Sequence, residues 1–386
     1  MFNGFSNANI YVEGKGIIKT SLKVEDGKIV SFENEEGLTL DDSLIVVPGF
    51  IDKHIHGANN SDSMYPTLDD IRNIAVTVAK EGVSSFLPTT MTQSEENIKK
   101  ALANINEYMK IQKEGSKVLG IHLEGPFISK KFKGAQPEEY VVPCDVDKFI
   151  EYNEVSGSNI MQVTLAVEEN GEELIKYLVK NNIVASIGHT NATSDEVLYA
   201  GTLGANSMTH TYNGMKPLHH REAGSVGGAL LCDDIYCEVI CDLVHVSDNA
   251  IKLLYRMKGH DKFVLITDGI ESKHLSDGKY KLGGQDVYVK NGEARLIDGT
   301  LAGSTLKMNV ALKNVSDVLG LTVDKAVDLC TINPARCLHI ADRKGSINLG
   351  KDADFAVIDK DFNVYMTVSN GQVIYKKASD INVNSK

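Results

Sequence analysis

The 386-residue chain is predicted to be an α/β protein whose main part is a (β/α)8 barrel. Short apolar runs alternate with amphipathic helical stretches through the middle of the chain. Polar residues suited to catalysis or metal binding stand at the C-terminal ends of most of these runs, and a barrel gathers such ends at one mouth. The eight runs cover residues 45–56, 84–90, 118–124, 161–167, 184–189, 207–212, 237–245 and 263–268.

Helical stretches with apolar residues at three-to-four spacing lie between most of the runs. Ser94, Ser194 and Ser247 precede three of them and are expected to be N-caps. A doubly wound open sheet has the same alternation, but it would usually separate the ends of its first and last strands. The barrel is therefore favoured. The expected helices are 68–80, 95–109, 172–180, 195–201 and 248–257.

Both ends of the chain differ from the middle, because short strand-like segments there are broken by glycine and acidic turns. We predict that residues 1–47 and 345–386 pair into one small β-sandwich, which flanks a catalytic barrel over residues 48–344. The expected strands are 8–12, 20–25, 28–33 and 44–47 near the start, and 354–359, 364–369 and 372–376 near the end.

Composition narrows the function. The net charge of -12 argues against nucleic acid or an anionic membrane as the main partner, so an anionic substrate would need a local cationic cluster. No signal-peptide pattern and no run of about 18 apolar residues is present, and the cytoplasm is the expected location. Cys232, Cys237 and Cys241 match no common zinc spacing, so buried thiols are favoured over a structural zinc site.

A metal centre is predicted at the barrel mouth. His54 and His56 form an H-x-H pair, and residues two apart in a strand point to the same side. One histidine alone is more often a hydrogen-bonded core residue, but several ligand types at one level of a barrel are hard to explain separately. Imidazole and carboxylate without thiolate suit Zn, Fe, Mn or Co and do not choose among them. The predicted ligands are His54, His56, Glu124, His189, His210 and Asp268.

With these motifs assembled, the chain resembles the N-acetylglucosamine-6-phosphate deacetylases of the amidohydrolase superfamily. The resemblance covers nearly the whole chain, and it depends on the order and combination of its motifs. It implies a metal-dependent barrel of the amidohydrolase type with a small β-sandwich built from both termini. The motifs are Pro-Gly-Phe-Ile-Asp at 48–52, His-Leu-Glu-Gly-Pro at 122–126, Gly-His-Thr at 188–190, His-Thr-Tyr-Asn-Gly-Met at 210–215, Thr-Asp-Gly at 267–269, Leu-Ala-Gly-Ser at 301–304, Asn-Pro-Ala-Arg at 333–336 and the segment 345–354.

The resemblance also implies a reaction. The acetyl group of N-acetylglucosamine 6-phosphate would be removed to give glucosamine 6-phosphate and acetate, in amino-sugar catabolism and cell-wall sugar recycling. Glu124, His189 and His210 would hold the tighter metal. His54 and His56 would form a second site that Glu124 bridges and Asp268 closes, so one or two divalent ions are expected. A metal-activated water would attack the amide carbonyl, with Asp268 as general base and acid. His122 is expected to support the ligands rather than to bind.

Substrate contacts are implied in the same way. Asn213, the Gly214 backbone, Arg221 and His245 would bind the phosphate, and His220 belongs to the cationic triplet 219–221. The arginine is expected to reach in from a neighbouring subunit, which implies a homodimer with shared active sites.

One residue departs from the family pattern. Gln136 stands twelve residues after Glu124, where many members have a histidine that helps to hold the substrate. Glutamine can donate a hydrogen bond but cannot carry a proton. We therefore expect the second metal to take a larger share in polarising the carbonyl.

Three alternatives remain at this point. The first is a deacetylase for N-acetylgalactosamine 6-phosphate, which differs in one hydroxyl orientation. The second is a cyclic-amide hydrolase, which is disfavoured because the run 161–167 contains no lysine to become carboxylated. The third is a barrel that has lost catalysis, which is disfavoured because all six expected ligands are retained. Neither a G-x-G-x-x-G nor a Walker A motif is present.

Overall fold

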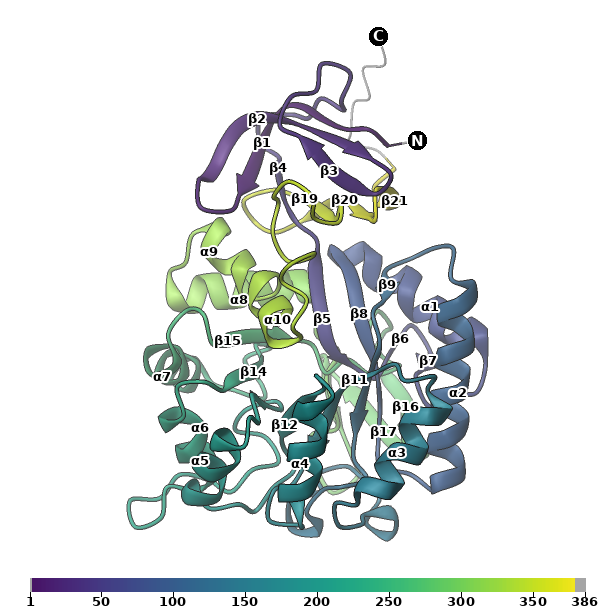
Figure 1. The fold of residues 1–386 in the computed structure, drawn as a ribbon, viewed down its shortest axis with the longest axis vertical. Coiled ribbons are helices and arrows are strands. Elements are labelled where there is room, and N and C mark those ends of the chain that lie inside the picture. The colour runs from purple at the N-terminus through teal and green to yellow at the C-terminus, as the bar shows by residue number, and fades with distance from the viewer. Residues whose placement is uncertain (1, 379–386) are drawn as a thin grey trace.

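The computed structural model describes residues 2–378, which form a barrel and a small sheet stacked on one end of it (Figure 1). Eight parallel strands follow one another around the barrel in chain order. The segment that follows the last strand meets the first strand, because the Asp268 N–H donates to the His54 carbonyl at 2.9 Å. The (β/α)8 prediction is confirmed. The strands are β5 (Phe50–Ile55), β8 (Val83–Thr90), β10 (Ile121–Glu124), β11 (Ile160–Leu165), β12 (Val184–Ile187), β13 (Ser207–Met208), β14 (Tyr236–Ile240) and β15 (Phe263–Ile266).

The five expected runs from 161–167 onward extend two to five residues past the ends of their strands, and two earlier runs differ more. The run 45–56 crosses between sheets, since Gly49 separates β4 (Ile45–Pro48) of the small sheet from β5 of the barrel. The run 118–124 is broken after β9 (Lys117–Val118), which pairs only with β8. An apolar run marks a buried segment, but it cannot report which of two sheets buries it.

A helix follows each barrel strand in the sequence. The five expected helices are confirmed, while α3, α6, α8, α9 and α10 were not predicted. Helix α6 is buried at seven of its eight residues and therefore lacks an alternation of polar and apolar residues. No helix within residues 2–378 is long and apolar enough to cross a membrane. The helices are α1 (Leu68–Val78), α2 (Glu95–Ile111), α3 (Val146–Val155), α4 (Gly171–Lys180), α5 (Ser194–Thr202), α6 (Gly224–Leu231), α7 (Asp248–Lys258), α8 (Met308–Leu319), α9 (Val323–Asp328) and α10 (Ile332–Cys337).

Of the three serines expected to be N-caps, one forms a cap hydrogen bond in the structure. The Ser94 side chain accepts a hydrogen bond from the Asn97 N–H, as predicted for a cap. Ser247 occupies the N-cap position of α7, but its side chain makes no cap hydrogen bond. The cap predicted at Ser194 is wrong, because Thr193 caps α5. The Glu196 side chain in turn accepts a hydrogen bond from the Thr193 N–H. The capping box outcompetes the neighbouring serine by satisfying two backbone donors together.

The small sheet combines both ends of the chain, which confirms the predicted small β-domain from both termini. Its strands are hydrogen-bonded into one continuous sheet, and β4 pairs with β1 on one side and β19 on the other. The buried faces of the two halves meet in one cluster, where the Phe5 and Phe355 rings lie 5.6 Å apart. The order is β21 (Gln372–Lys376), β20 (Val364–Ser369), β19 (Phe355–Ile358), β4, β1 (Gly4–Val12), β2 (Gly16–Glu25) and β3 (Lys28–Ser31).

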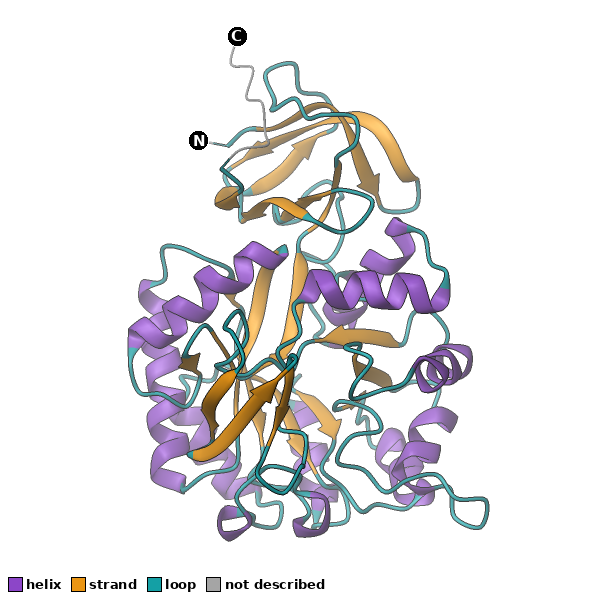
Figure 2. Cartoon of the chain, turned by 180° about the vertical axis from the view of Figure 1, so that it is seen from behind, coloured by secondary structure: helices purple, strands orange, loops and turns teal. Residues whose placement is uncertain are grey.

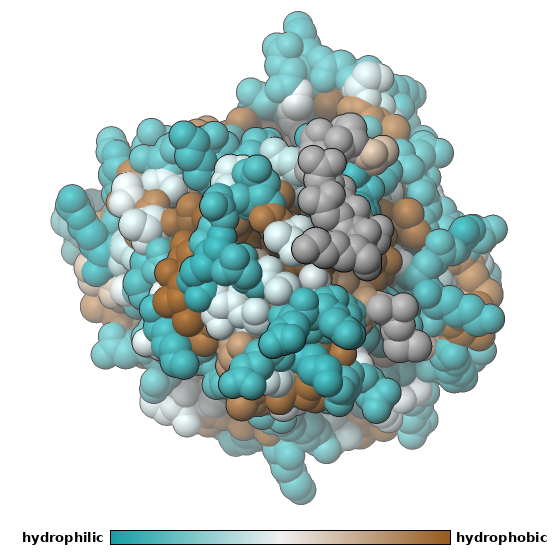
Figure 3. All heavy atoms as spheres, turned by 90° about the horizontal axis from the view of Figure 1, so that it is seen from above, coloured by the Kyte–Doolittle hydropathy of each residue, from teal (hydrophilic) through white to brown (hydrophobic). Residues whose placement is uncertain are grey.

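The position of the small sheet shows which end of the barrel is the mouth. Strand β5 leaves β4 and runs away from the small sheet, so the carboxyl ends of the barrel strands lie at the opposite end (Figure 1). The end that carries the small sheet presents a mostly hydrophilic face with small hydrophobic groups (Figure 3). The barrel mouth is therefore at the end remote from this face.

An additional hairpin sheet, which the sequence did not predict, follows β15. It lies on the side of the barrel that Figure 2 turns toward the viewer. Gln285 Nε2 donates to the Ala135 carbonyl at 2.5 Å, and Gln93 Nε2 donates to the Gly283 carbonyl at 3.3 Å. These bonds tie the hairpin to loops that follow β8 and β10. Its strands are β16 (Gly278–Leu282), β17 (Gln285–Lys290) and β18 (Glu293–Arg295).

Candidate metal centre and active site

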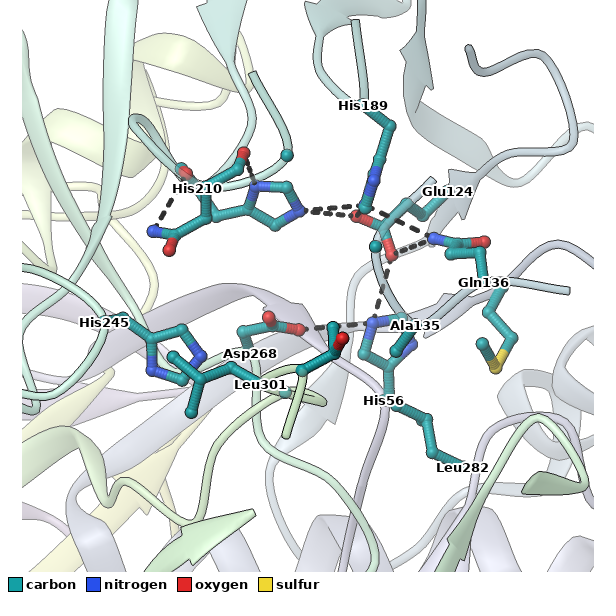
Figure 4. Close-up of a pocket in the computed structure, with 16 residues that line it drawn as sticks. His56, Glu124, Ala135, Gln136, His189, His210, His245, Asp268, Leu282 and Leu301 are labelled. Carbon is teal, nitrogen blue, oxygen red and sulfur yellow. Dashed lines mark hydrogen bonds and ion pairs between the residues drawn. The ribbon is translucent and has the colours of Figure 1, made fainter. Parts of the chain in front are cut away.

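Two groups of side chains with metal-ligand chemistry lie at the barrel mouth, and Figure 4 shows all of their members except His54. Within each group the ligand atoms all lie within 4.8 Å of one another, and every member is buried. One group comes from β5 and the residue that follows Thr267, and the other from the ends of β10, β12 and β13. The structure thus brings all six predicted ligands together. The groups are His54, His56 and Asp268, and Glu124, His189 and His210.

Glu124 lies between the two groups. Its Oε1 atom is 3.2 Å from His210 Nε2 and 3.4 Å from His189 Nε2. Its Oε2 atom is 3.1 Å from His56 Nε2. Because the two oxygens of one carboxylate face different groups, Glu124 has the position of a bridging ligand.

The outer ring nitrogen of each histidine is occupied by an acceptor. Carbonyl and carboxylate oxygens can only accept, so each Nδ1 must carry the hydrogen. Each Nε2 then directs a lone pair toward the centre, the arrangement that metal-binding histidines adopt. The pairs are His54 with Glu238 Oε2 at 3.0 Å, His56 with the Thr89 carbonyl at 3.1 Å, His189 with the Phe132 carbonyl at 2.8 Å and His210 with the Asn213 carbonyl at 3.0 Å.

These lone pairs fit a bound cation. The His189 and His210 Nε2 atoms lie only 3.1 Å apart, and His54 Nε2 is buried without a hydrogen-bond partner. Burial alone would lower the pKa of His56, yet its contacts with Asp268 and Glu124 raise that pKa to about 10. The carboxylates therefore demand positive charge in the cluster. A divalent ion bound there would supply it, and the donor set suits Zn, Fe, Mn or Co.

Three of the ligands have an unusual backbone conformation. The φ angles of His189, His210 and Asp268 are 45°, 30° and 49°, in the left-handed region that non-glycine residues rarely adopt. Each residue lies two positions beyond the end of its strand. The strained turns direct these side chains into the mouth, and strain of this kind concentrates at functional sites.

The cavity beside the ligands contains most of the predicted substrate contacts. Gln136, Asn213, Gly214 and His245 line it together with all of the predicted ligands except His54. His245 lies beside Asp268 and Leu301 in Figure 4. Apolar side chains complete the wall, and the sequence analysis missed them because they come from loops and the hairpin. These are Met91, Ala135, Leu282 and Leu301.

Gln136 is held at both ends of its amide. Its Oε1 accepts the Thr92 N–H at 2.7 Å, and its Nε2 donates to Glu124 Oε2 at 3.0 Å. The residue lines the cavity, where Nε2 with its second N–H also lies 3.5 Å from His189 Nε2. Gln136 can therefore orient Glu124 and donate to a bound ligand from the same nitrogen.

His220 and Arg221 do not reach the cavity of their own chain. They line a separate hollow on the surface, where Arg221 Nη1 lies 2.8 Å from His220 Nε2. Among the described residues that line the active-site cavity, none is lysine or arginine. The predicted cationic cluster is therefore remote from the metal centre within one chain.

The sequence analysis missed two charged residues beneath the centre, Lys53 and Glu238. Both side chains are fully buried, and Glu238 Oε1 lies 2.7 Å from Lys53 Nζ. Burial alone would raise the pKa of Glu238, but Lys53 and His54 hold that pKa well below its usual range. A charged residue inside an apolar run could have signalled this pair, because a buried charge must be compensated.

The expectation that His122 supports the ligands stays a prediction, because its hydrogen-bond partners are Thr89, Thr164 and Gln162. It belongs to neither ligand group, and its Nε2 lies 2.7 Å from Thr164 Oγ1. Among the described residues no cysteine belongs to a potential metal group, and all six cysteines are free.

Comparison with known proteins agrees with this geometry. Residues 45–374 match the model of the amidohydrolase family. The chain belongs to the amidohydrolase family. This amidohydrolase is 39% identical over 385 residues to an N-acetylglucosamine-6-phosphate deacetylase of Bacillus subtilis, covering 96% of this chain and 97% of that relative. It is also 34% identical over 354 residues to an N-acetylgalactosamine-6-phosphate deacetylase of Escherichia coli, covering 91% and 94%.

A solved structure extends the agreement to the fold. The N-acetylglucosamine-6-phosphate deacetylase of Thermotoga maritima aligns with this amidohydrolase at a TM-score of 0.89 and 37% identity, covering 97% of this chain and 100% of that one. The resemblance drawn from the motifs is therefore confirmed. The chain is a hydrolase with the barrel and small β-domain of its relatives.

Proposed function

We propose that this amidohydrolase removes the acetyl group of N-acetylglucosamine 6-phosphate and releases glucosamine 6-phosphate and acetate. The observation that carries the proposal is the position of Glu124 between two ligand groups, beside a cavity that Asp268 also lines. Relatives that align over nearly the whole chain carry the name of this activity. The reaction would serve amino-sugar catabolism and cell-wall sugar recycling. Six free thiols support a cytoplasmic location.

The two ligand groups support a centre of two divalent ions. Glu124, His189 and His210 would hold one ion, and His54, His56 and Asp268 the other, with Glu124 as the bridge. Bound divalent metal would lower the pKa of water and polarise the acetyl carbonyl. The fixed Nδ1 hydrogen bonds keep all four Nε2 lone pairs directed at this centre, so no ring has to turn when an ion binds.

Asp268 is the proposed proton carrier. Its Oδ1 lies 3.2 Å from His56 Nε2, and the residue borders the cavity where the amide must lie. Asp268 would accept the proton of the attacking water and return it to the departing sugar amine. Its backbone is fixed by the N–H bond to the His54 carbonyl, so the carboxylate is positioned before substrate arrives.

Gln136 would bind the acetyl carbonyl. One N–H of its Nε2 atom is used by Glu124, and the second would donate to the oxygen that becomes negative during attack. This contribution is a hydrogen bond without proton transfer. We therefore propose that the ion of the His54 group supplies more of the polarisation than it would beside a histidine.

The phosphate group supports a homodimer with shared sites. Asn213, the Gly214 backbone and His245 would contact the phosphate, but the cavity lining has no lysine or arginine to balance its charge. Arg221 is exposed on a loop that also exposes Leu218. We propose that Arg221 of a second copy, with His220 beside it, completes the phosphate site, because guanidinium binds phosphate in a bidentate manner.

N-acetylgalactosamine 6-phosphate is the second candidate substrate. The Escherichia coli relative named for that sugar is 34% identical over most of both chains. The two sugars differ only in the orientation of one hydroxyl, and their acetyl and phosphate groups would make the same contacts.

Acetate release tests the proposal. Metal-replete protein would be assayed with the 6-phosphates of N-acetylglucosamine and N-acetylgalactosamine and with both unphosphorylated sugars, while bound metal is measured on the same sample. We expect release from N-acetylglucosamine 6-phosphate and much less from its unphosphorylated form. Preference for the galactosamine substrate would favour the second candidate. Absence of release from either phosphorylated sugar would contradict the deacetylase proposal.

A further inference from the structure

A buried ion pair lies directly beneath the metal centre, and the proposed reaction gives it no task. Lys53 of β5 and Glu238 of β14 are both fully buried, with Nζ and Oε1 2.7 Å apart. Lys53 Nζ also donates to Gln162 Oε1 at 2.6 Å and to Ser207 Oγ at 3.0 Å. The ammonium therefore has a partner for each of its three hydrogens, all inside the barrel.

An irregularity in β5 allows two consecutive residues, Lys53 and His54, to contact the same carboxylate. Neighbouring residues of a regular strand point to opposite faces of the sheet. The register of β5 against β8 shifts between Asp52 and Ile55, as in a β-bulge. Consecutive residues Lys53 and His54 both contact Glu238 as a result. The bulge thus places a cation and a metal ligand on the same carboxylate.

Glu238 connects the two ligand groups from below. Its Oε2 atom accepts the His54 Nδ1–H at 3.0 Å and the His210 backbone N–H at 3.2 Å. Its Oε1 atom accepts Gln162 Nε2–H at 2.8 Å in addition to Lys53. A ring of one group and the main chain of the other are therefore fixed by a single side chain.

We propose that the Lys53–Glu238 pair is a positioning element that sets the affinity of the His54, His56 and Asp268 group for its divalent ion. A carboxylate that accepts from Nδ1 fixes the orientation of the imidazole and strengthens Nε2 as a donor to metal. Lys53 supplies the charge that allows this carboxylate to remain buried and ionised. The inference rests on the proposed function in one respect, the presence of two ions.

The contacts of Glu238 predict an unequal effect on the two ions. In the His54 group it holds a ring that binds metal. In the other group it touches only the His210 backbone, while the His189 and His210 rings are held by the Phe132 and Asn213 carbonyls. Loss of the Glu238 charge should therefore weaken the ion of the His54 group far more than the ion bound by Glu124, His189 and His210.

The chain offers a matched control. Glu81 and Lys273 form another fully buried pair, with 2.9 Å between Oε2 and Nζ, and Glu81 also bonds to His274. None of the contacts of Glu81 is a predicted metal ligand. Glu81→Gln and Glu238→Gln remove the same charge from equally buried lysine pairs. A purely structural role would therefore change metal binding alike in both variants.

The experiment is a titration of metal-free full-length protein with Co(II), followed by absorption spectroscopy and by metal content after dialysis. We expect wild type and Glu81→Gln to bind two ions per chain with the same affinities. Glu238→Gln should bind the first ion nearly as wild type does and the second about 10- to 100-fold more weakly. Should Glu238→Gln fail to fold, the uncharged double variant Lys53→Met/Glu238→Gln replaces it, with the same expectation.

Several results would overturn the inference. Two ions bound with wild-type affinities by the Glu238 variant would remove the positioning role. An equal loss of both ions, or the same loss in Glu81→Gln, would reduce the effect to general stability. Wild type that binds a single ion would instead refute the two-metal part of the proposed function and the inference with it. That failure is recognisable from the wild-type sample alone.

Discussion

Asp268 closes the barrel onto His54. Its backbone N–H donates to the His54 carbonyl at 2.9 Å, and its Oδ1 lies 3.4 Å from His54 Nε2. The first bond joins the segment that follows the last barrel strand to the first strand, and the second contact lies within one of the two ligand groups. One of the hydrogen bonds that close the barrel and one contact of the metal centre therefore involve the same pair of residues.

The first prediction concerns the proton carried by Asp268. Asp268→Asn preserves the backbone bond to His54 and one side-chain oxygen, but an amide cannot accept the proton of water. We expect turnover to fall by about 100- to 10,000-fold, the usual range for a general base, with most of the metal retained. Acetate release and metal content on the same sample measure both quantities. Turnover near that of wild type would assign the proton transfer to another group.

The second prediction is that metal stabilises the fold. Without a cation, the facing lone pairs of His189 and His210 and the carboxylates of Glu124 and Asp268 repel one another in a buried site. A ligand that binds only the folded state adds about 2.7 kcal/mol at a free concentration of 100 times Kd. Chelation should lower Tm, and added Zn(II), Mn(II) or Co(II) should restore it. If chelation removes the metal and Tm does not change, the prediction that metal at this site stabilises the fold is contradicted.

The residue pattern alone was enough to predict the barrel fold and the six metal ligands. Residues such as Glu124 and His210 follow short apolar runs, and barrel topology gathers the carboxyl ends of all strands at one mouth. Neither step requires knowledge of side-chain packing. The same is true of α2, whose apolar spacing and Ser94 cap were both visible in the sequence.

What the pattern could not supply depends on backbone geometry and long-range pairing. The residue types do not predict the left-handed φ angles of His189 and His210. The sequence also does not predict the bulge that brings Lys53 and His54 to the same carboxylate. Regular strand alternation would place these two side chains on opposite faces. Glu238 lies in an apolar run far along the chain from its partner, so only the closed barrel reveals the pair.

The third prediction separates two roles of Gln136. Gln136→Ala removes the hydrogen bond to Glu124 Oε2 and the proposed donor to the substrate carbonyl. We expect kcat to fall by about tenfold to a thousandfold, as for loss of one oxyanion donor, with a smaller change in KM. Gln136→His should recover part of the loss, since an imidazole N–H can also donate. Unchanged turnover in Gln136→Ala would show that the residue has no such role.

The fourth prediction concerns the glycine beside His189. Gly214 has a φ of 59°, and a Cβ atom built there would lie 3.0 Å from His189 Nδ1. Gly214→Ala should therefore strain the turn and displace a metal ligand, which lowers metal affinity as well as turnover. Gly320→Ala is the matched control, because that left-handed glycine has nothing within 4 Å of its Cβ position. Equal metal affinity in the two variants would contradict the predicted displacement.

The last prediction tests shared active sites by mixing two inactive variants. Arg221→Ala keeps Asp268 but lacks the arginine that we propose enters the neighbouring site, while Asp268→Asn keeps the arginine but lacks the proton carrier. In a mixed dimer, the site with Asp268 receives Arg221 from the other copy and is complete, and the second site lacks both groups. Random exchange of equal amounts makes half of the dimers mixed, so about a quarter of wild-type activity should return. Arg221 acting within its own chain would give no recovery, because each chain would still lack one group. Refolding the variants together and separately, with dimer formation checked by ultracentrifugation, distinguishes the two arrangements.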